Sequence, residues 1–149
     1  MLPKLKVLFL CTGNSCRSQM AEGWARRLLG DRIEPYSAGV APTTIDPHAV
    51  RVMQEVGIDL GDQRSKHLDE LSNLDFDIVV TVCDHASRNC PRFPGKTRTL
   101  HIGFDDPPHL AEGVHDEEEA LGHYRRVRDE IRSYVEKLPR TLERSIGED

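Results

Sequence analysis

The chain has 149 residues, of which 38% are hydrophobic and 30% charged, and its formal net charge at pH 7 is -5. This length and composition are ordinary for a folded protein, so we expect residues 1–149 to form a single domain. The acidic balance argues against a nucleic-acid-binding protein, and the sequence has no apolar run near the ~20 residues that span a bilayer. The short apolar start is typical of a buried strand rather than a secretory signal, so we expect a cytoplasmic protein.

The first predicted strand covers residues 6–10, an apolar run that ends in a glycine-containing loop, as a central parallel strand does. A helix follows and ends near Gly30. Its apolar positions recur at three- and four-residue steps, namely Met20, Trp24, Leu28 and Leu29.

A second, weaker strand is predicted over 33–38. Pro35 lies within it and favours an edge of the sheet, because proline cannot donate a hydrogen bond to a neighbouring strand. The Asp46-Pro47 pair predicts the start of a second helix, and Gly57 predicts its end. The mixed segment 58–74 predicts loop and one short helix.

The strongest strand pattern covers residues 76–82, directly before Cys83. Residues 97–102 predict a fourth strand, and residues 103–108 predict a loop. The acidic run over 116–119 predicts the solvated first turn of a long amphipathic helix. The apolar positions of this helix are Ala120, Leu121, Tyr124, Val127, Ile131, Val135 and Leu138, and its expected outer face carries Arg125, Arg126 and Arg128.

This order of elements predicts an α/β fold of three layers, in which a parallel four-stranded sheet has helices on both faces. Ligands of such sheets bind outside the carboxyl ends of the strands. Cys11, Cys83 and the Asp105-Asp106 pair all follow predicted strands. We therefore expect these side chains to meet at one end of the sheet.

The loop between the first strand and the first helix is a candidate oxyanion site. Its small and polar residues can turn their backbone N–H groups around a tetrahedral anion, aided by the positive end of the helix dipole. Arg17 would clamp the anion with two hydrogen bonds. The expected binding residues are Thr12, Gly13, Asn14, Ser15, Cys16 and Arg17.

Cys11 is the candidate nucleophile beneath this anion. The helix N-terminus and the Arg17 guanidinium favour its thiolate, and Ser18 can donate a further hydrogen bond. We expect Asn14 to hold the loop in shape and the Cys16 side chain to pack. The alternative for Cys11, a small buried residue at a strand end, leaves the loop without a role.

The other two cysteines are Cys83 and Cys90, seven positions apart. The cysteine spacings differ from those of a zinc knuckle, and static disulfides are unusual in the cytosol, so thiol chemistry is the favoured interpretation. The histidines show no ligand spacing. We expect no metal and no other cofactor.

The Cys-x5-Arg-Ser loop resembles that of the low-molecular-weight protein tyrosine phosphatase family. The resemblance implies a strand–loop–helix cradle, with Cys11 as nucleophile and the aspartate of an Asp-Pro step as general acid. Asp106-Pro107 matches that step, and Asp105 is the neighbouring candidate. The tyrosine phosphatases of the family carry an aromatic residue after the step, whereas this chain has Pro108.

The full set of motifs is similar to the thioredoxin-coupled arsenate reductases built on the same fold. The matching stretches are 11–24, 36–39, the two downstream cysteines and 103–107. The resemblance implies that Cys11 attacks arsenate, that Cys83 attacks Cys11 and releases arsenite, and that Cys90 then attacks Cys83. It implies that thioredoxin reduces the final disulfide. We also expect a monomer with a weak phosphatase side activity.

Two other functions stay open at this point. A phosphatase acting on phosphotyrosine or another phosphomonoester would need Cys11 and Asp106 but neither downstream cysteine. A thiol sensor would bind an oxyanion and form a disulfide without turnover.

The spacing of Cys83 and Cys90 predicts a conformational change. In a regular helix their Cα atoms would be about 10.5 Å apart, whereas a disulfide needs roughly 4.4–6.8 Å. The intervening residues are mostly polar and give the segment little to bury. We expect oxidation to unwind it, and equal amide exchange of residues 84–89 in reduced and oxidised protein would contradict this.

The chain also departs from the pattern of some relatives at one place. Those relatives bind potassium through residues that match Asn14, Glu22 and Ser37, together with a threonine-x-aspartate stretch. Here that stretch reads Arg64-Ser65-Lys66. We expect the Lys66 ammonium to replace the ion and to pair with Glu22, the alternative being a solvated surface lysine.

Overall fold

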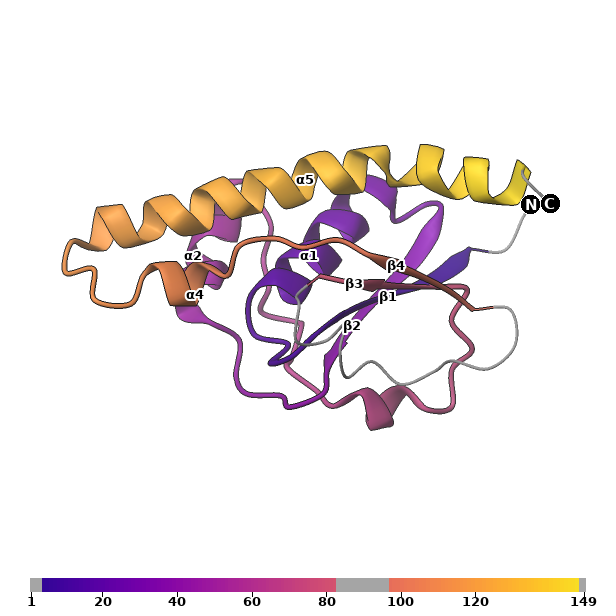
Figure 1. Cartoon of the computed structure of the whole chain (residues 1–149), viewed down its shortest axis with the longest axis horizontal. Helices are drawn as coiled ribbons and strands as arrows, with labels where there is room; N and C mark the ends of the chain where they lie inside the picture. The colour runs from indigo at the N-terminus through magenta and orange to yellow at the C-terminus, as the bar shows by residue number, and fades with distance from the viewer. Residues whose placement is uncertain (1–3, 83–96, 148–149) are drawn as a thin grey trace.

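The computed structural model describes residues 4–82 and 97–147, with residues 141–147 as backbone only (Figure 1). In these residues, four parallel strands form one sheet in the order β2-β1-β3-β4. The strands are β1 Leu5–Cys11, β2 Ile33–Gly39, β3 Ile78–Thr81 and β4 Arg98–His101. The helices are α1 Arg17–Leu29, α2 Pro47–Glu55, the 3-10 helix η1 Leu68–Leu71, α4 Pro107–Leu110 and α5 Glu117–Gly147. The α/β class with a four-stranded parallel sheet is confirmed.

The strand register brings the carboxyl ends of the strands together. Cys11 lies opposite Gly39, and Leu10 lies opposite Thr81, which in turn pairs with His101. The interior strand β1 is the apolar run that predicted it, and its residues from Val7 to Leu10 are fully buried. The weaker strand β2 lies at the edge, as Pro35 predicted.

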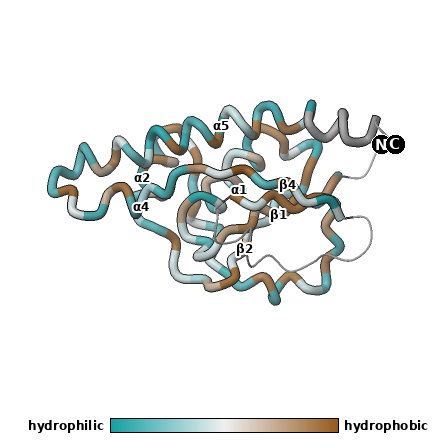
Figure 2. Tube along the Cα trace, viewed as in Figure 1, coloured by the Kyte–Doolittle hydropathy of each residue, from teal (hydrophilic) through white to brown (hydrophobic). Residues whose placement is uncertain are grey.

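Helix α1 packs between the sheet and α5 (Figure 1). All seven apolar positions predicted for α5 are buried, and Figure 2 shows apolar and polar residues alternating along this helix. Burial of each large apolar side chain contributes about 1.5–3 kcal/mol. A hydrogen bond also fixes the position of α1 against α5, because Trp24 of α1 donates its indole N–H to the carbonyl of Arg128 at 3.1 Å. Together these contacts fix the helix that follows the Cys11 loop.

The prediction for Arg128 was wrong. Its side chain is buried against α2, where it donates to the carbonyl of Val52 and to Glu55, both at 2.9 Å. Helical spacing explains this, because position 128 is four residues after Tyr124 and three before Ile131 and so shares the buried face. The charge of arginine suggested the outer face, which Arg126 does occupy.

The prediction that 103–108 is entirely loop was also wrong, because α4 begins at Pro107 with Asp106 as its N-cap. The same Asp-Pro pattern correctly predicted the start of α2, where Asp46 accepts from the N–H of His48 at 2.9 Å. After α2, Gly57 adopts a positive φ of 81°, as expected for a residue that ends a helix.

Candidate active site

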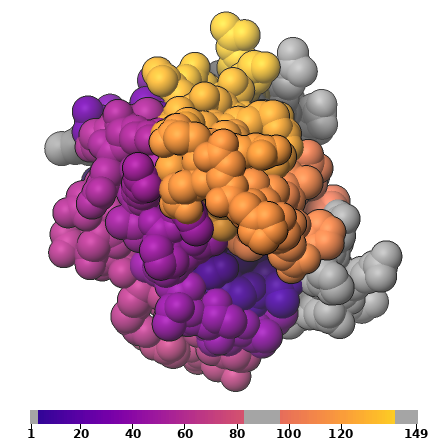
Figure 3. Space-filling view, turned by 90° about the vertical axis from the view of Figure 1, so that its left-hand side faces the viewer, coloured from indigo at the N-terminus to yellow at the C-terminus, as the bar shows by residue number. Residues whose placement is uncertain are grey.

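Cys11 is the last residue of β1 and is buried, and α1 begins six residues later at Arg17. The end view in Figure 3 shows indigo atoms from the start of the chain at the bottom of a hollow. Purple atoms of the segment that follows β2 and orange atoms around α4 and the start of α5 border this hollow. The loop 12–16 therefore lies at the carboxyl end of the sheet, where the sequence predicted a ligand site.

The carbonyl groups of this loop are held by partners outside it. Thr12, Gly13 and Ser15 accept hydrogen bonds from the backbone N–H groups of Ala41, Thr43 and Asp46, at 2.9, 3.0 and 2.9 Å. The Gly13 carbonyl also accepts from the Ser65 hydroxyl at 3.0 Å, and the Asn14 carbonyl accepts from Gln19 Nε2 at 3.0 Å.

These partners direct the N–H groups of the loop. In a trans peptide the carbonyl and the following N–H point in opposite directions, and the described chain contains no cis peptide. The N–H groups of Gly13, Asn14, Ser15 and Cys16 therefore point away from the outer partners. That of Asn14 lies 3.2 Å from Cys11 Sγ. The loop is an open cradle of amide donors around the thiol, as expected for an oxyanion site.

Gly39 allows the outer segment to approach the loop. A Cβ atom on this residue would lie 2.5 Å from the Thr12 carbonyl oxygen and 3.0 Å from the Asn14 nitrogen. Those distances are too short for any side chain, so the end of β2 can lie against the cradle only with glycine here.

Asn14 holds the cradle in shape, as predicted. It is fully buried and adopts a φ of 49°, in the left-handed region that asparagine tolerates. Its Oδ1 accepts from the N–H of Lys66 at 3.0 Å, and its Nδ2 donates to Ser18 Oγ at 2.8 Å. Ser18 Oγ lies 2.8 Å from Cys11 Sγ. Asn14 occupies one acceptor site of the serine oxygen and leaves its hydrogen available, so the serine hydroxyl can donate to a Cys11 thiolate.

Arg17 and Asp106 come together at the rim of the cradle. Arg17 Nη1 donates to the Phe104 carbonyl at 2.8 Å, and Nη2 lies 3.4 Å from Asp106 Oδ1. Asp105 instead points to α5, where Arg126 Nη2 binds it at 3.0 Å. Of the two aspartates, Asp106 is therefore the one beside Arg17.

The second thiol of the loop, Cys16, is packed as expected. It is 3% exposed. Burial raises its pKa well above the ordinary value, and the nearby Asp46 carboxylate raises it further, although Arg17 acts in the opposite direction. The protein thus disfavours a thiolate at Cys16 while surrounding Cys11 with donors.

Cys83 and Cys90 lie outside the described residues, as does the segment between them. The last described residue before them is Val82, whose N–H donates to the carbonyl of Leu10 at 2.9 Å. The residues that precede Cys11 and Cys83 in the sequence are therefore hydrogen-bonded neighbours.

The predicted pairing of Lys66 with Glu22 was wrong. Arg26 Nη2 binds the Glu22 carboxylate at 2.6 Å, and the Ser37 hydroxyl donates to its other oxygen at 2.6 Å. Arg26 is one turn after Glu22 on α1 and so reaches it locally. Lys66 Nζ donates instead to the carbonyl of Arg64 at 3.1 Å. Burial lowers the pKa of Lys66, while the Glu22 charge opposes that shift.

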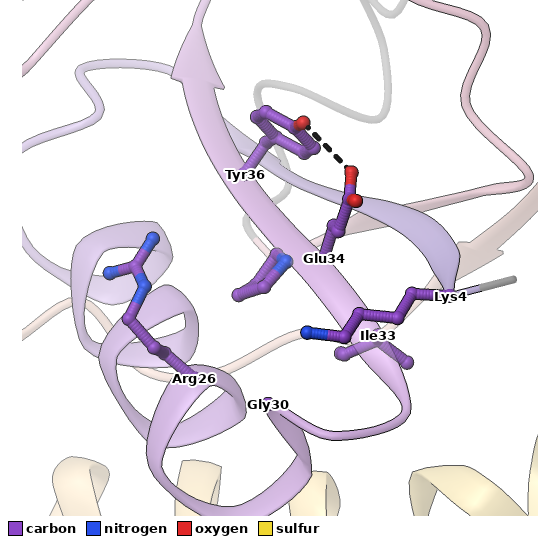
Figure 4. A pocket seen from close by; sticks show the side chains of 7 residues that line it. Lys4, Arg26, Gly30, Ile33, Glu34 and Tyr36 are labelled. Atoms are coloured by element: carbon purple, nitrogen blue, oxygen red, sulfur yellow. Dashed lines mark hydrogen bonds between the residues drawn. The ribbon is translucent and has the colours of Figure 1, made fainter.

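A second hollow, of about 330 Å³, lies at the opposite end of β2 (Figure 4). It is lined by Lys4, Arg26, Gly30, Ile33, Glu34, Pro35 and Tyr36. Ile33 is opposite Leu5 at the start of β1, six positions from Cys11. In this hollow the Tyr36 hydroxyl donates to Glu34 at 3.2 Å, and Arg26 is engaged by Glu22. This hollow is therefore separate from the cradle.

Sequence reasoning missed the outer partners of the cradle. Asp46 was recognised only as a helix cap, and Gln19 and Ser65 gave no signal. Within the described residues, no group of three or more histidine, cysteine, aspartate or glutamate side chains could hold a metal ion. In the same residues, no helix is both long and apolar enough to cross a membrane.

Comparisons with known proteins agree with this geometry. Residues 6–147 match the family described as low molecular weight phosphotyrosine protein phosphatase. An arsenate reductase of Halalkalibacterium halodurans is 46% identical over 138 residues, which cover 93% of this chain and 97% of that protein. The crystal structure of an arsenate reductase from Archaeoglobus fulgidus has a TM-score of 0.70 and 32% identity, covering 89% of this chain and 97% of that one. A low molecular weight protein tyrosine phosphatase from T. tengcongensis has a TM-score of 0.70 and 30% identity, covering 93% and 99% of the two chains.

Proposed function

The chain belongs to the low molecular weight phosphotyrosine protein phosphatase family, and on that premise we propose that it reduces arsenate to arsenite. The observation that carries the proposal is the environment of Cys11 Sγ, which lies 3.2 Å from the backbone nitrogen of Asn14 and 2.8 Å from Ser18 Oγ, at a loop whose N–H groups point away from its outer partners. This arrangement suits a tetrahedral oxyanion and a thiolate nucleophile equally. The relative named arsenate reductase, 46% identical to this chain, supports arsenate as that anion.

Arsenate binds in the cradle as phosphate would, because the two ions share shape and charge. The N–H groups of 13–16 point to its oxygens, and Arg17 turns from the Phe104 carbonyl to bind two of them. Thiols reduce arsenic(V) and do not reduce phosphorus(V), so the same cradle supports reduction of one anion and ester hydrolysis of the other.

In the first step the Cys11 thiolate attacks arsenic, and one oxygen leaves as water after Asp106 supplies a proton. The product is a thioester of arsenate on Cys11, with arsenic still in the +5 state. The position of Asp106 Oδ1 near the Arg17 guanidinium supports this role, because the same rim receives the departing oxygen.

In the second step the Cys83 thiolate attacks Cys11 Sγ. The electron pair of the sulfur–arsenic bond stays with arsenic, which leaves as arsenite in the +3 state, and a Cys11–Cys83 disulfide remains. Cys90 then attacks Cys83 and releases Cys11 as a thiolate. The resulting Cys83–Cys90 disulfide is reduced by the dithiol of thioredoxin, which becomes oxidised in turn.

A weak phosphatase activity on phosphomonoesters accompanies this reaction. The support is the common fold with a named tyrosine phosphatase and a cradle that does not distinguish phosphate from arsenate. The phosphatase reaction uses Cys11 and Asp106 and then water, and needs neither downstream cysteine.

The proposed setting is the cytoplasm, where thioredoxin keeps thiols reduced. The protein is proposed to act there as one domain and as a monomer. Light scattering of the reduced protein at working concentration tests the monomer, and a dimer mass would contradict it.

The experiment that tests the function measures arsenite formation with thioredoxin, thioredoxin reductase and NADPH. The proposal expects turnover in the wild type and none in Cys83→Ser or Cys90→Ser. Hydrolysis of p-nitrophenyl phosphate should survive in both variants and disappear in Cys11→Ser. Disulfide formation without arsenite would indicate a sensor, and phosphatase activity without arsenite a phosphatase.

A further inference from the structure

We propose that Tyr124 is a positioning residue for the oxyanion cradle, acting through Asp46. Tyr124 belongs to α5 and touches no part of the loop through a hydrogen bond of its own that the structure describes. Its hydroxyl donates to Asp46 Oδ2 at 2.6 Å, and the backbone N–H of Asp46 donates to the Ser15 carbonyl at 2.9 Å. The inference rests on the proposed function only in that the cradle binds an oxyanion.

The Ser15 carbonyl matters because it shares a peptide plane with the N–H of Cys16. Holding that carbonyl outward aims this N–H into the cradle. Of the three backbone donors that hold the loop, Ala41 and Thr43 lie in an exposed stretch. Asp46 is the third donor. Both oxygens of its carboxylate accept hydrogen bonds, so its position is fixed by side-chain contacts.

The two anchors of Asp46 come from different elements. Oδ1 accepts from the N–H of His48 in the first turn of α2, and Oδ2 accepts from Tyr124 of α5. The first fixes Asp46 relative to its own helix, and the second fixes that helix start relative to the core. Tyr124 is itself held firmly, since it is 2% exposed and its ring packs against His48 with centroids 5.1 Å apart.

The Tyr124 hydroxyl also compensates an unfavourable charge. Asp46 lies near enough to Cys16 for its carboxylate to raise the pKa of that thiol, so a negative charge stands close to an anion site. The hydroxyl donates to that charge, and burial, together with the hydrogen bond to Asp46, raises the pKa of the Tyr124 phenol, which therefore stays a donor. Without the hydroxyl, the carboxylate can turn toward the anion and release the Ser15 carbonyl.

The test is the Tyr124→Phe variant, which removes the hydroxyl and keeps the ring. Inorganic phosphate is titrated against the rate at which iodoacetamide alkylates Cys11, followed by mass spectrometry of the Cys11 peptide. We expect the phosphate concentration for half protection to rise about five- to tenfold, the effect of losing one ordinary hydrogen bond, because Tyr124 acts on the cradle only through Asp46. Alkylation without phosphate should change less than twofold, because Ser18 and Asn14 are untouched.

The matched control is Tyr36→Phe, which also removes a phenol hydroxyl bound to a carboxylate, that of Glu34, but in the middle of β2, at the other hollow. Its protection curve should equal that of the wild type. An Asp46→Ala background adds a second check, since Tyr124→Phe should there cause no further loss if it acts through Asp46.

The outcomes separate the two proposals. If phosphate protects the wild type and Tyr124→Phe equally, the role of Tyr124 is overturned and the proposed function stands. If Tyr124→Phe weakens protection as strongly in the Asp46→Ala background, action through Asp46 is overturned. If phosphate does not protect the wild type at all, the oxyanion cradle itself fails.

Discussion

Cys11 Sγ and Ser18 Oγ lie 2.8 Å apart, across the loop that separates the first strand from the first helix. Asn14 Nδ2 donates to the same serine oxygen at 2.8 Å, so the serine hydrogen is free to point to the sulfur. A thiolate at Cys11 therefore has a hydroxyl donor on one side and the N–H of Asn14 on another. This relationship separates Cys11 chemically from Cys16 in the same loop.

Ser18→Ala should weaken the nucleophile. Losing one hydrogen bond to a charged group costs about 1.5–3 kcal/mol, so we expect Cys11 to ionise at a pH higher by one unit or more and kcat/KM at pH 7 to fall at least about tenfold. The rate of iodoacetamide alkylation against pH measures the ionisation. Ser133→Ala, on the exposed side of α5, is the control, and an unchanged profile in Ser18→Ala would contradict the role of the hydroxyl.

Asp106→Asn should remove the proposed proton donor and leave phosphate binding intact. General acid catalysis contributes about 10²–10⁴-fold, and the loss should be greatest for aryl phosphates with poor leaving groups. Steady-state hydrolysis of a series of aryl phosphates measures this dependence. Asp105→Asn is the matched control, because Asp105 binds Arg126 rather than Arg17. A larger loss in Asp105→Asn than in Asp106→Asn would reverse the assignment.

Potassium should not stimulate the enzyme. Arg26 and Ser37 already occupy the Glu22 carboxylate, and Lys66 adds a second cation nearby. We expect kcat/KM for arsenate to differ by less than twofold between potassium chloride and choline chloride at equal ionic strength. A several-fold gain with potassium would show that a cation enters beside these side chains.

The junction between α2 and α5 should make stability depend on pH. Hydrogen bonds from Arg125, and also from Arg128, lower the pKa of Glu55 to about 2. Because the folded pKa lies below the ordinary value, this carboxylate stabilises the protein above about pH 4.5, and that contribution is lost as the pH falls toward 2.

We therefore expect Glu55→Gln to lower the free energy of unfolding by about 1 kcal/mol at pH 7, a value reduced for partial exposure of the pair. The difference from wild type should shrink between pH 4.5 and pH 3. Urea unfolding at a series of pH values measures it. Glu136→Gln removes an exposed pair with Arg132 and should change stability little. A difference for Glu55→Gln that is the same at pH 7 and pH 3 would exclude the ion pair as its cause.

The sequence predicted those parts of the site that depend on local patterns. The apolar run before Cys11 and the spacing from Cys11 to Arg17 define the strand, the loop and the helix start, and each follows from neighbours in the chain. The position of Asp106 followed from topology, because carboxyl ends of parallel strands share one edge of the sheet.

The parts that the sequence did not predict depend on long-range contacts or on side-chain length. No sequence pattern marks Ala41 and Thr43, because it is their backbone N–H groups that donate to the loop and every residue except proline has one. Arg128 lies on the buried face because its long side chain can reach Val52 and Glu55 with its charge paired. Glu22 pairs with Arg26 rather than with Lys66, because Arg26 is one helical turn away on the same helix. The position of Lys66 depends on the path of the 63–66 segment, which no local pattern predicts.

The central claim is that an oxidation passes from Cys11 outward to two further cysteines. The most direct measurement is mass mapping of disulfides after a single turnover with arsenate and no thioredoxin. We expect a Cys83–Cys90 disulfide in the wild type and a Cys11–Cys83 disulfide in Cys90→Ser, each with one equivalent of arsenite. Arsenite formation with Cys83 and Cys90 still reduced, or no arsenite and no disulfide at all, would contradict it.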